Sequence, residues 1–80
     1  MSERSRLRWL CRRGMKELDD LLAGYLEREY DTAPADVQAA FARLLELQDP
    51  DLYALVTGRT AASDPAIHDV VARIRRSAVH

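Results

Sequence analysis

The residues best suited to chemistry lie together near the start of the chain, in the stretch Arg12-Arg13-Gly14-Met15-Lys16-Glu17. Here two guanidinium groups, an ammonium group and a carboxylate surround one glycine. Because Gly14 has no Cβ, another backbone or side chain can approach it closely. Glu17 falls in the first turn of the helix that we expect to follow, beside Arg13. The stretch therefore predicts a compact charged patch.

A purely structural interpretation of the same residues is also open. Gly14 would be the N-cap of the following helix and Glu17 would reach back to its amide, an arrangement that stabilises a helix by about 0.5–2 kcal/mol. The charges do not fit a purely stabilising role, because Arg12, Arg13 and Lys16 place positive charge at the positive end of the helix dipole. This pattern favours a contact with another molecule.

Trp9 lies off the apolar stripe that Leu7, Leu10 and Cys11 form on a first, short helix. An aromatic side chain among arginines is typical of a protein-interface hot spot. The alternative is that Trp9 covers the end of the hydrophobic core. If the patch around Gly14 is a contact, we expect Arg6, Trp9, Arg12 and Met15 to be neighbouring partner-binding residues.

No pattern in the sequence is typical of an enzyme. No serine stands in a glycine-flanked nucleophile elbow, and neither histidine forms a recognisable nucleophile–base pattern. The sequence also lacks a phosphate-binding loop and a glycine-rich dinucleotide turn, so no motif predicts flavin or nucleotide binding by this chain alone. Helix surface and helix caps explain the carboxylate pairs better than catalysis does: Asp19 with Asp20, and Asp49 with Asp51. We therefore predict no catalytic residue.

The single cysteine, Cys11, excludes an internal disulfide, and only His68 and His80 could join it in a metal site. A structural zinc needs about four ligands. Cys11 lies on the inner face of the first helix, so we expect a small buried hydrophobe rather than a reactive thiol. His68 has no second ligand at helical spacing, which predicts a surface histidine. We expect no metal and no stably bound cofactor.

Hydrophobic periodicity predicts five helices that position these residues, at about 2–11, 15–30, 34–47, 50–57 and 65–77. Their apolar stripes are Leu7, Leu10 and Cys11; Met15, Leu18, Leu22, Tyr25 and Leu26; Val37, Ala40, Phe41, Leu44 and Leu45; Leu52, Leu55 and Val56; Ile67, Val70, Val71 and Ile74. No segment alternates apolar and polar residues over a useful length, so we expect no sheet.

Proline, aspartate and glycine mark the ends of these helices. Pro34 suits a first helical turn, where its missing N–H is harmless. In Asp49-Pro50 the carboxylate can accept unpaired N–H groups, and Asp64-Pro65 gives the same signal before the last helix. Gly58 supplies a C-terminal cap. The short connections favour an antiparallel bundle.

The composition favours one folded helical domain. Of the 80 residues, 48% are hydrophobic and only three each are Gly and Pro. This length has room for one core, so we expect one domain over 1–80, an all-α, compact, five-helix antiparallel bundle. No apolar run approaches the ~20 residues that span a bilayer, and a lone cysteine suits a reducing compartment. We expect a cytoplasmic protein without membrane insertion, although the arginine-rich start could also be the remnant of a transit peptide.

Residues 9–19, with the sequence Trp-Leu-Cys-Arg-Arg-Gly-Met-Lys-Glu-Leu-Asp, resemble the signature region of the SdhE (YgfY) family of succinate dehydrogenase flavinylation and assembly factors. That family is marked by an Arg-Gly-x-x-Glu motif, matched here by Arg13, Gly14 and Glu17. Three further segments resemble the family in the same order: Glu29-Tyr30-Asp31, Leu44-Leu45-Glu46 and Asp49-Pro50-Asp51-Leu52-Tyr53. The chain departs from the pattern at Ala33-Pro34-Ala35, which is less polar than expected at a helix start and leaves the motif intact.

The resemblance implies a five-helix bundle with a non-enzymatic role. Members of the family bind the flavoprotein subunit of succinate dehydrogenase, and of related fumarate reductases, and promote the covalent attachment of FAD to a histidine of that subunit. Carried over to this chain, Arg13, Gly14 and Glu17 would lie at the partner contact, and FAD would be attached to the partner. We expect the free protein to be a monomer.

Two other classes of function stay open. The basic first segment could belong to a small nucleic-acid-binding or antitoxin-like module. Phosphate binding, however, needs more net positive charge on one face than a chain of net charge -1 clearly offers, so we expect no nucleic-acid partner. A self-standing flavin carrier is the other class, and it would be yellow on purification.

Overall fold

A computed structural model describes residues 2–78, and this part of the chain forms helices and no strand. In chain order the elements are α1 (Glu3–Leu10), α2 (Lys16–Arg28), the 3-10 helix η1 (Tyr30–Thr32), α3 (Ala35–Leu44), α4 (Asp49–Val56) and α5 (Pro65–Ser77). The predicted all-α bundle of five α-helices is confirmed.

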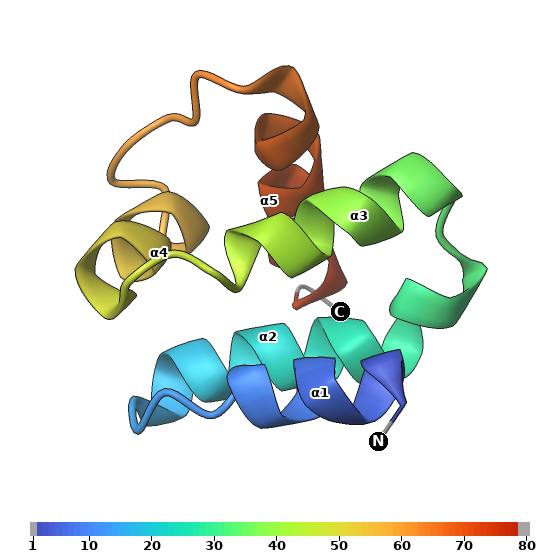
Figure 1. Cartoon of the computed structure of the whole chain (residues 1–80). Helices are drawn as coiled ribbons and strands as arrows, with labels where there is room; N and C mark the ends of the chain where they lie inside the picture. Colours follow the sequence, from blue (N-terminus) through green and yellow to red (C-terminus); the bar gives the residue numbers. More distant parts are fainter. Residues whose placement is uncertain (1, 79–80) are drawn as a thin grey trace.

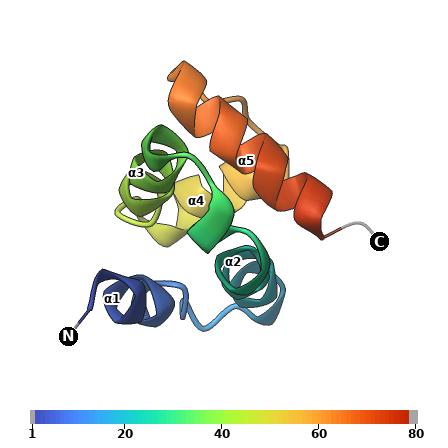
Figure 2. The same cartoon turned by 90° about the vertical axis from the view of Figure 1, so that its right-hand side faces the viewer.

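The first three α-helices run back and forth. α1 and α2 lie side by side in opposite directions, and α3 returns above α2 (Figure 1). α5 crosses α2 and α3 and packs against both, while α4 contacts α5. Figure 2 shows α1 at the edge of the molecule, beside α2 and away from α5. The outer surface of α1 is therefore left open.

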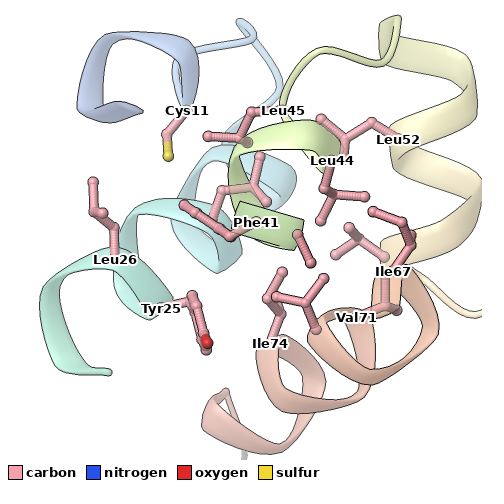
Figure 3. Packing of buried hydrophobic residues seen from close by; sticks show 14 of the residues in the cluster. Cys11, Tyr25, Leu26, Phe41, Leu44, Leu45, Leu52, Ile67, Val71 and Ile74 are labelled. Atoms are coloured by element: carbon pink, nitrogen blue, oxygen red, sulfur yellow. The ribbon is translucent and has the colours of Figure 1, made fainter. Parts of the chain in front are cut away.

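The apolar stripes of all five helices meet in one core. Phe41 of α3 stands near its middle (Figure 3). The centroid of its ring lies 5.1 Å from that of Tyr25 and 5.7 Å from that of Tyr30. Side chains from α2, α3, α4 and α5 point toward one another around it. Burying each large apolar side chain contributes roughly 1.5–3 kcal/mol, so this shared core holds the short helices together.

Several predicted end signals are present. Asp64 caps α5 by accepting the N–H of Ala66 at 2.8 Å, and this bond, with the Arg43 guanidinium, holds the pKa of the Asp64 carboxyl below its ordinary value. Gly58 follows the end of α4 with a φ of +81°, the left-handed conformation of a C-terminal cap.

Two predicted helix starts were wrong in detail. Asp49 does not cap α4, because it is the first residue of that helix and its carboxylate lies 3.2 Å from the guanidinium of Arg13. Gln48 is the N-cap, without a side-chain bond. Pro34 stands one residue before α3, as its N-cap, and not in the first turn.

α1, α2 and α3 are shorter than the periodicity indicated, and α2 and α3 end two or more residues early. α2 ends at Arg28, and the residues after it form η1. α3 ends at Leu44. After it the backbone hydrogen bonds span three residues instead of four, as in the bond from the Leu47 N–H to the Leu44 carbonyl at 3.1 Å. None of the described helices is long and apolar enough to cross a membrane.

Candidate functional site

The predicted patch lies in the connection between α1 and α2, residues 11–15, which we call the motif turn. Gly14 has a φ of +80°, in the left-handed region that favours glycine. A Cβ added at Gly14 would meet no heavy atom within 4 Å. Glycine is therefore required here by the backbone conformation, and its open side faces free space.

Arg13 points into the molecule, with only 12% of its side chain exposed. Its Nε donates to the carbonyl of Leu10 at 2.8 Å, and Nη1 donates to the carbonyl of Leu47 at 2.9 Å. Nη1 also donates to Asp49, and Nη2 donates to the carbonyl of Leu45. Hydrogen bonds from a charged donor contribute about 1.5–3 kcal/mol each, so Arg13 fastens the motif turn to the turn between α3 and α4.

This arrangement corrects the expected place of Arg13 beside Glu17. Within residues 2–78 the two side chains form no ion pair or hydrogen bond with each other. The guanidinium satisfies carbonyls that α3 leaves free where it ends. Arg13 thus supports the patch from inside and does not offer its charge on the surface.

Asp19 holds the motif turn from the other side, a role that the sequence did not reveal. Its Oδ1 accepts the backbone N–H of Arg13 at 2.8 Å, and its Oδ2 accepts the N–H of Gly14 at 3.2 Å. Met15 is the N-cap of α2, with no side-chain cap bond. The interpretation in which Gly14 caps α2 and Glu17 reaches back was therefore wrong. A carboxylate five residues after a glycine was the signal that could have pointed to Asp19.

Glu17 and Arg12 face solvent on either side of Gly14. Neither makes a hydrogen bond or ion pair with a side chain in residues 2–78, so their charges are available to a partner. Lys16 pairs with Asp20 at 3.0 Å, but both side chains are highly exposed and such a pair stabilises little. Met15 is half-buried and packs against the core.

The outer face of α1 carries Trp9, which is 70% exposed to solvent. The alternative in which Trp9 covers the core was wrong, because α1 directs it away from the bundle. Beside Trp9 is a hollow lined by Ser5, Arg8 and Arg12. Arg6 lies on the same helix, exposed, with its Nε 2.9 Å from the Glu3 carboxylate. Trp9 is the large apolar side chain that residues 2–78 leave exposed.

Cys11 is buried in the core, as predicted, with 1% of its surface exposed. Burial raises the pKa of its thiol to about 11, because the thiolate would lose its solvation there. The thiol is therefore protonated near neutral pH and unsuited to nucleophilic attack. His68 is exposed, as expected, and residues 2–78 contain no cluster of three His, Cys, Asp or Glu side chains that could hold a metal.

The sequence model of one protein family, described as "Flavinator of succinate dehydrogenase", matches residues 5–78. The chain belongs to this flavinator family. The match spans the motif turn and every residue of the predicted contact. The family resemblance inferred from the sequence is confirmed.

Proteins similar to this chain occur in several bacteria. The protein named FAD assembly factor SdhE in Methylococcus capsulatus is 48% identical over 75 residues, which are 94% of this chain and 90% of that protein. The proteins of the same name in Shewanella oneidensis and Idiomarina loihiensis are 38% and 37% identical over 71 residues, or 89% of this chain, and the match covers 87% and 79% of their own lengths.

Proposed function

We propose that this protein is an assembly factor that binds the flavoprotein subunit of succinate dehydrogenase, and of related fumarate reductases, and promotes the covalent attachment of FAD to a histidine of that subunit. Membership of the flavinator family carries the proposal, together with relatives named FAD assembly factor over most of the chain. On this proposal the protein acts in the cytoplasm as a monomer, and FAD stays with the partner.

The contact that we propose is the docking face, made of Arg6, Trp9, Arg12, Gly14, Met15 and Glu17. It combines an exposed indole with the charges of Arg12 and Glu17, which have no partner in the described chain, and a glycine whose open side meets free space. Tryptophan and arginine are enriched among residues that dominate binding energy. Arg13 belongs to the site as its internal support, since its guanidinium is occupied within the fold.

Attachment of the flavin needs a histidine nitrogen aligned with the 8α-methyl group and stabilisation of the negative charge that develops on the flavin ring. The flavoprotein supplies both reacting groups. The assembly factor acts by holding the domains of the flavoprotein in the reactive arrangement, and it then dissociates. A modest and polar interface suits such a transient partner.

The first test is capture of the flavoprotein subunit on the immobilised protein, followed by in-gel fluorescence of covalently bound flavin. We expect the wild type to capture the subunit and to raise its fluorescence, and Glu17→Ala to lose both by tenfold or more, on the order of a removed interface charge. Glu17 is solvated in the free protein, so the variant should keep the wild-type melting temperature.

Asp36→Ala is the matched control. Like Glu17, Asp36 is an exposed carboxylate in the first turn of its helix without an ion pair in residues 2–78, but it lies at the start of α3. It should bind and stimulate as the wild type does. Full activity of Glu17→Ala would remove Glu17 from the contact, and absence of capture by the wild type would refute the proposed function.

The structure weakens the case for nucleic-acid binding. Arg4 lies 3.0 Å from Asp31, Arg8 lies 2.8 Å from Glu27, and Arg13 is turned inward. Phosphate binding depends on cations that are free to replace counterions. Much of the basic N-terminal charge is already paired within the fold, so we advance no second function.

A further inference from the structure

We propose that Asp19 is a positioning residue for the partner contact, acting through the backbone of Arg13 and Gly14. The inference rests on the proposed function, because the contact that Asp19 positions is the docking face. One carboxylate accepts two successive N–H groups, at 2.8 Å from Arg13 and 3.2 Å from Gly14. These bonds fold the motif turn back over the start of α2.

The bonds of Asp19 do not serve the helix to which it belongs. The unpaired N–H groups at the start of α2 are those of Met15 and the residues that follow it. Asp19 instead binds the two N–H groups that precede them. Its hydrogen bonds therefore act on the conformation of the turn, including the φ of +80° at Gly14, while its negative charge in the first turn also favours α2.

Asp19 completes a clamp on the motif turn. The guanidinium of Arg13 is held by the turn between α3 and α4, while the backbone of the same residue is held by Asp19. With both anchors in place, Gly14 and the start of α2, which carries Glu17, keep one mutual orientation. Without Asp19, the backbone at Gly14 can leave the left-handed region, since glycine populates both signs of φ.

The loss of this clamp should weaken binding more than it weakens the fold. Gly14 is exposed, so water can replace the carboxylate at its N–H, whereas the part-buried bond from the Arg13 N–H contributes about 1 kcal/mol. Partner affinity, by contrast, falls in proportion to the fraction of molecules that hold the competent turn conformation. We expect the dissociation constant for the flavoprotein subunit to rise about tenfold in Asp19→Ala.

The experiment compares wild type, Asp19→Ala, Asp19→Asn and Asp20→Ala. Asp20 is the matched control, because it is the neighbouring carboxylate and pairs only with the exposed Lys16 within residues 2–78. For each we would measure the dissociation constant for the purified flavoprotein subunit, the yield of covalent flavin, the melting temperature, and hydrogen exchange of the Arg13 and Gly14 amides by NMR.

Asp19→Ala should exchange both amides faster and bind more weakly, with the melting temperature lowered by only about 4–8 °C. Asp19→Asn should be intermediate, since its amide group offers one acceptor oxygen in place of two. Asp20→Ala should match the wild type. If Asp19→Ala binds weakly and melts at a lower temperature, but its Arg13 and Gly14 amides exchange at the wild-type rate, Asp19 has a general structural role. That result would overturn the proposal.

The two proposals fail in different ways. Wild-type affinity in Asp19→Ala, with the wild type itself bound, would overturn positioning and leave the assembly function intact. If the wild type does not bind the flavoprotein subunit, the proposed function fails and the partner role of Asp19 fails with it. Amide exchange would then still decide whether Asp19 fixes the turn.

Discussion

At Gly14 the backbone has a φ of +80°, and a Cβ would meet nothing within 4 Å. Two reasons for a glycine can be separated here. The backbone conformation affects the stability of the free protein, whereas the open space affects the binding of a partner at the turn. Alanine and asparagine distinguish them, because both add a side chain but only asparagine adopts the left-handed region readily.

We expect Gly14→Ala to lower the free energy of unfolding by about 1–2 kcal/mol and Gly14→Asn to lower it less. Both should weaken binding of the flavoprotein subunit, because both fill the space that the partner would use. Urea denaturation and binding titrations measure the two effects. Unchanged stability of Gly14→Ala would contradict the strain argument, and unchanged binding of Gly14→Asn would place the partner elsewhere.

At the scale of the elements, the Arg13 side chain joins the motif turn to the turn between α3 and α4. Arg13 connects the end of α1 with the turn between α3 and α4, through the carbonyls of Leu45 and Leu47. Those carbonyls are free because α3 stops at Leu44. The geometry of the docking face is thus tied to a part of the chain more than thirty residues away in sequence, with a separation of 34 between Arg13 and Leu47.

Replacing Arg13 should therefore disturb stability as well as binding. We expect Arg13→Ala to lower the free energy of unfolding by about 2–4 kcal/mol, because part-buried carbonyls and Asp49 lose their charged donor. Arg13→Lys should recover only part of this, since an ammonium group cannot reproduce the planar fork that reaches several acceptors. Urea denaturation gives the free energies.

Arg12→Ala is the control for Arg13, because Arg12 is an exposed neighbour without an ion pair in residues 2–78. It should leave stability within about 0.5 kcal/mol of the wild type. Hydrogen exchange should show loosening of residues 45–49 in Arg13→Ala alone. Wild-type stability of Arg13→Ala would mean that the observed bonds do not hold the turn.

At the scale of the whole molecule, the buried thiol of Cys11 links folding to alkaline pH. Burial raises its pKa from an ordinary 9.0 to about 11. The unfolded chain releases this proton above pH 9, while the folded protein holds it until about pH 11. Stability from this group is therefore full below pH 9 and falls as the pH rises toward 11.

Cys11→Ala should lose part of the alkaline decrease in stability. Burial also raises the pKa of Tyr25 and Tyr30, but both tyrosines remain in the variant, so the difference between the two proteins isolates the thiol. Urea denaturation from pH 7 to 10.5 measures it. Parallel stability curves for the two proteins would show that the thiol does not titrate differently in the folded and unfolded states.

The sequence by itself determined the helices and the core. The stripes built around Leu18, Phe41 and Ile74 repeat with helical spacing, and their members are buried together. Such patterns are local, because one face of a helix must be apolar to be buried at all. The Arg-Gly-x-x-Glu motif was identified through the resemblance to a family, which compares residue types and needs no knowledge of the fold.

Only the tertiary structure decided what each residue of the motif does. Arg13 and Glu17 look alike in sequence, as charges near one helix start, yet one is turned inward and the other is solvated. The acceptors that draw Arg13 inward belong to the end of α3, whose position depends on packing between helices. Asp19 differs from Arg13, because the N–H groups that it accepts lie only five and six residues before it in the sequence. The partners of Arg13 are set by distances across the fold, which local spacing does not contain.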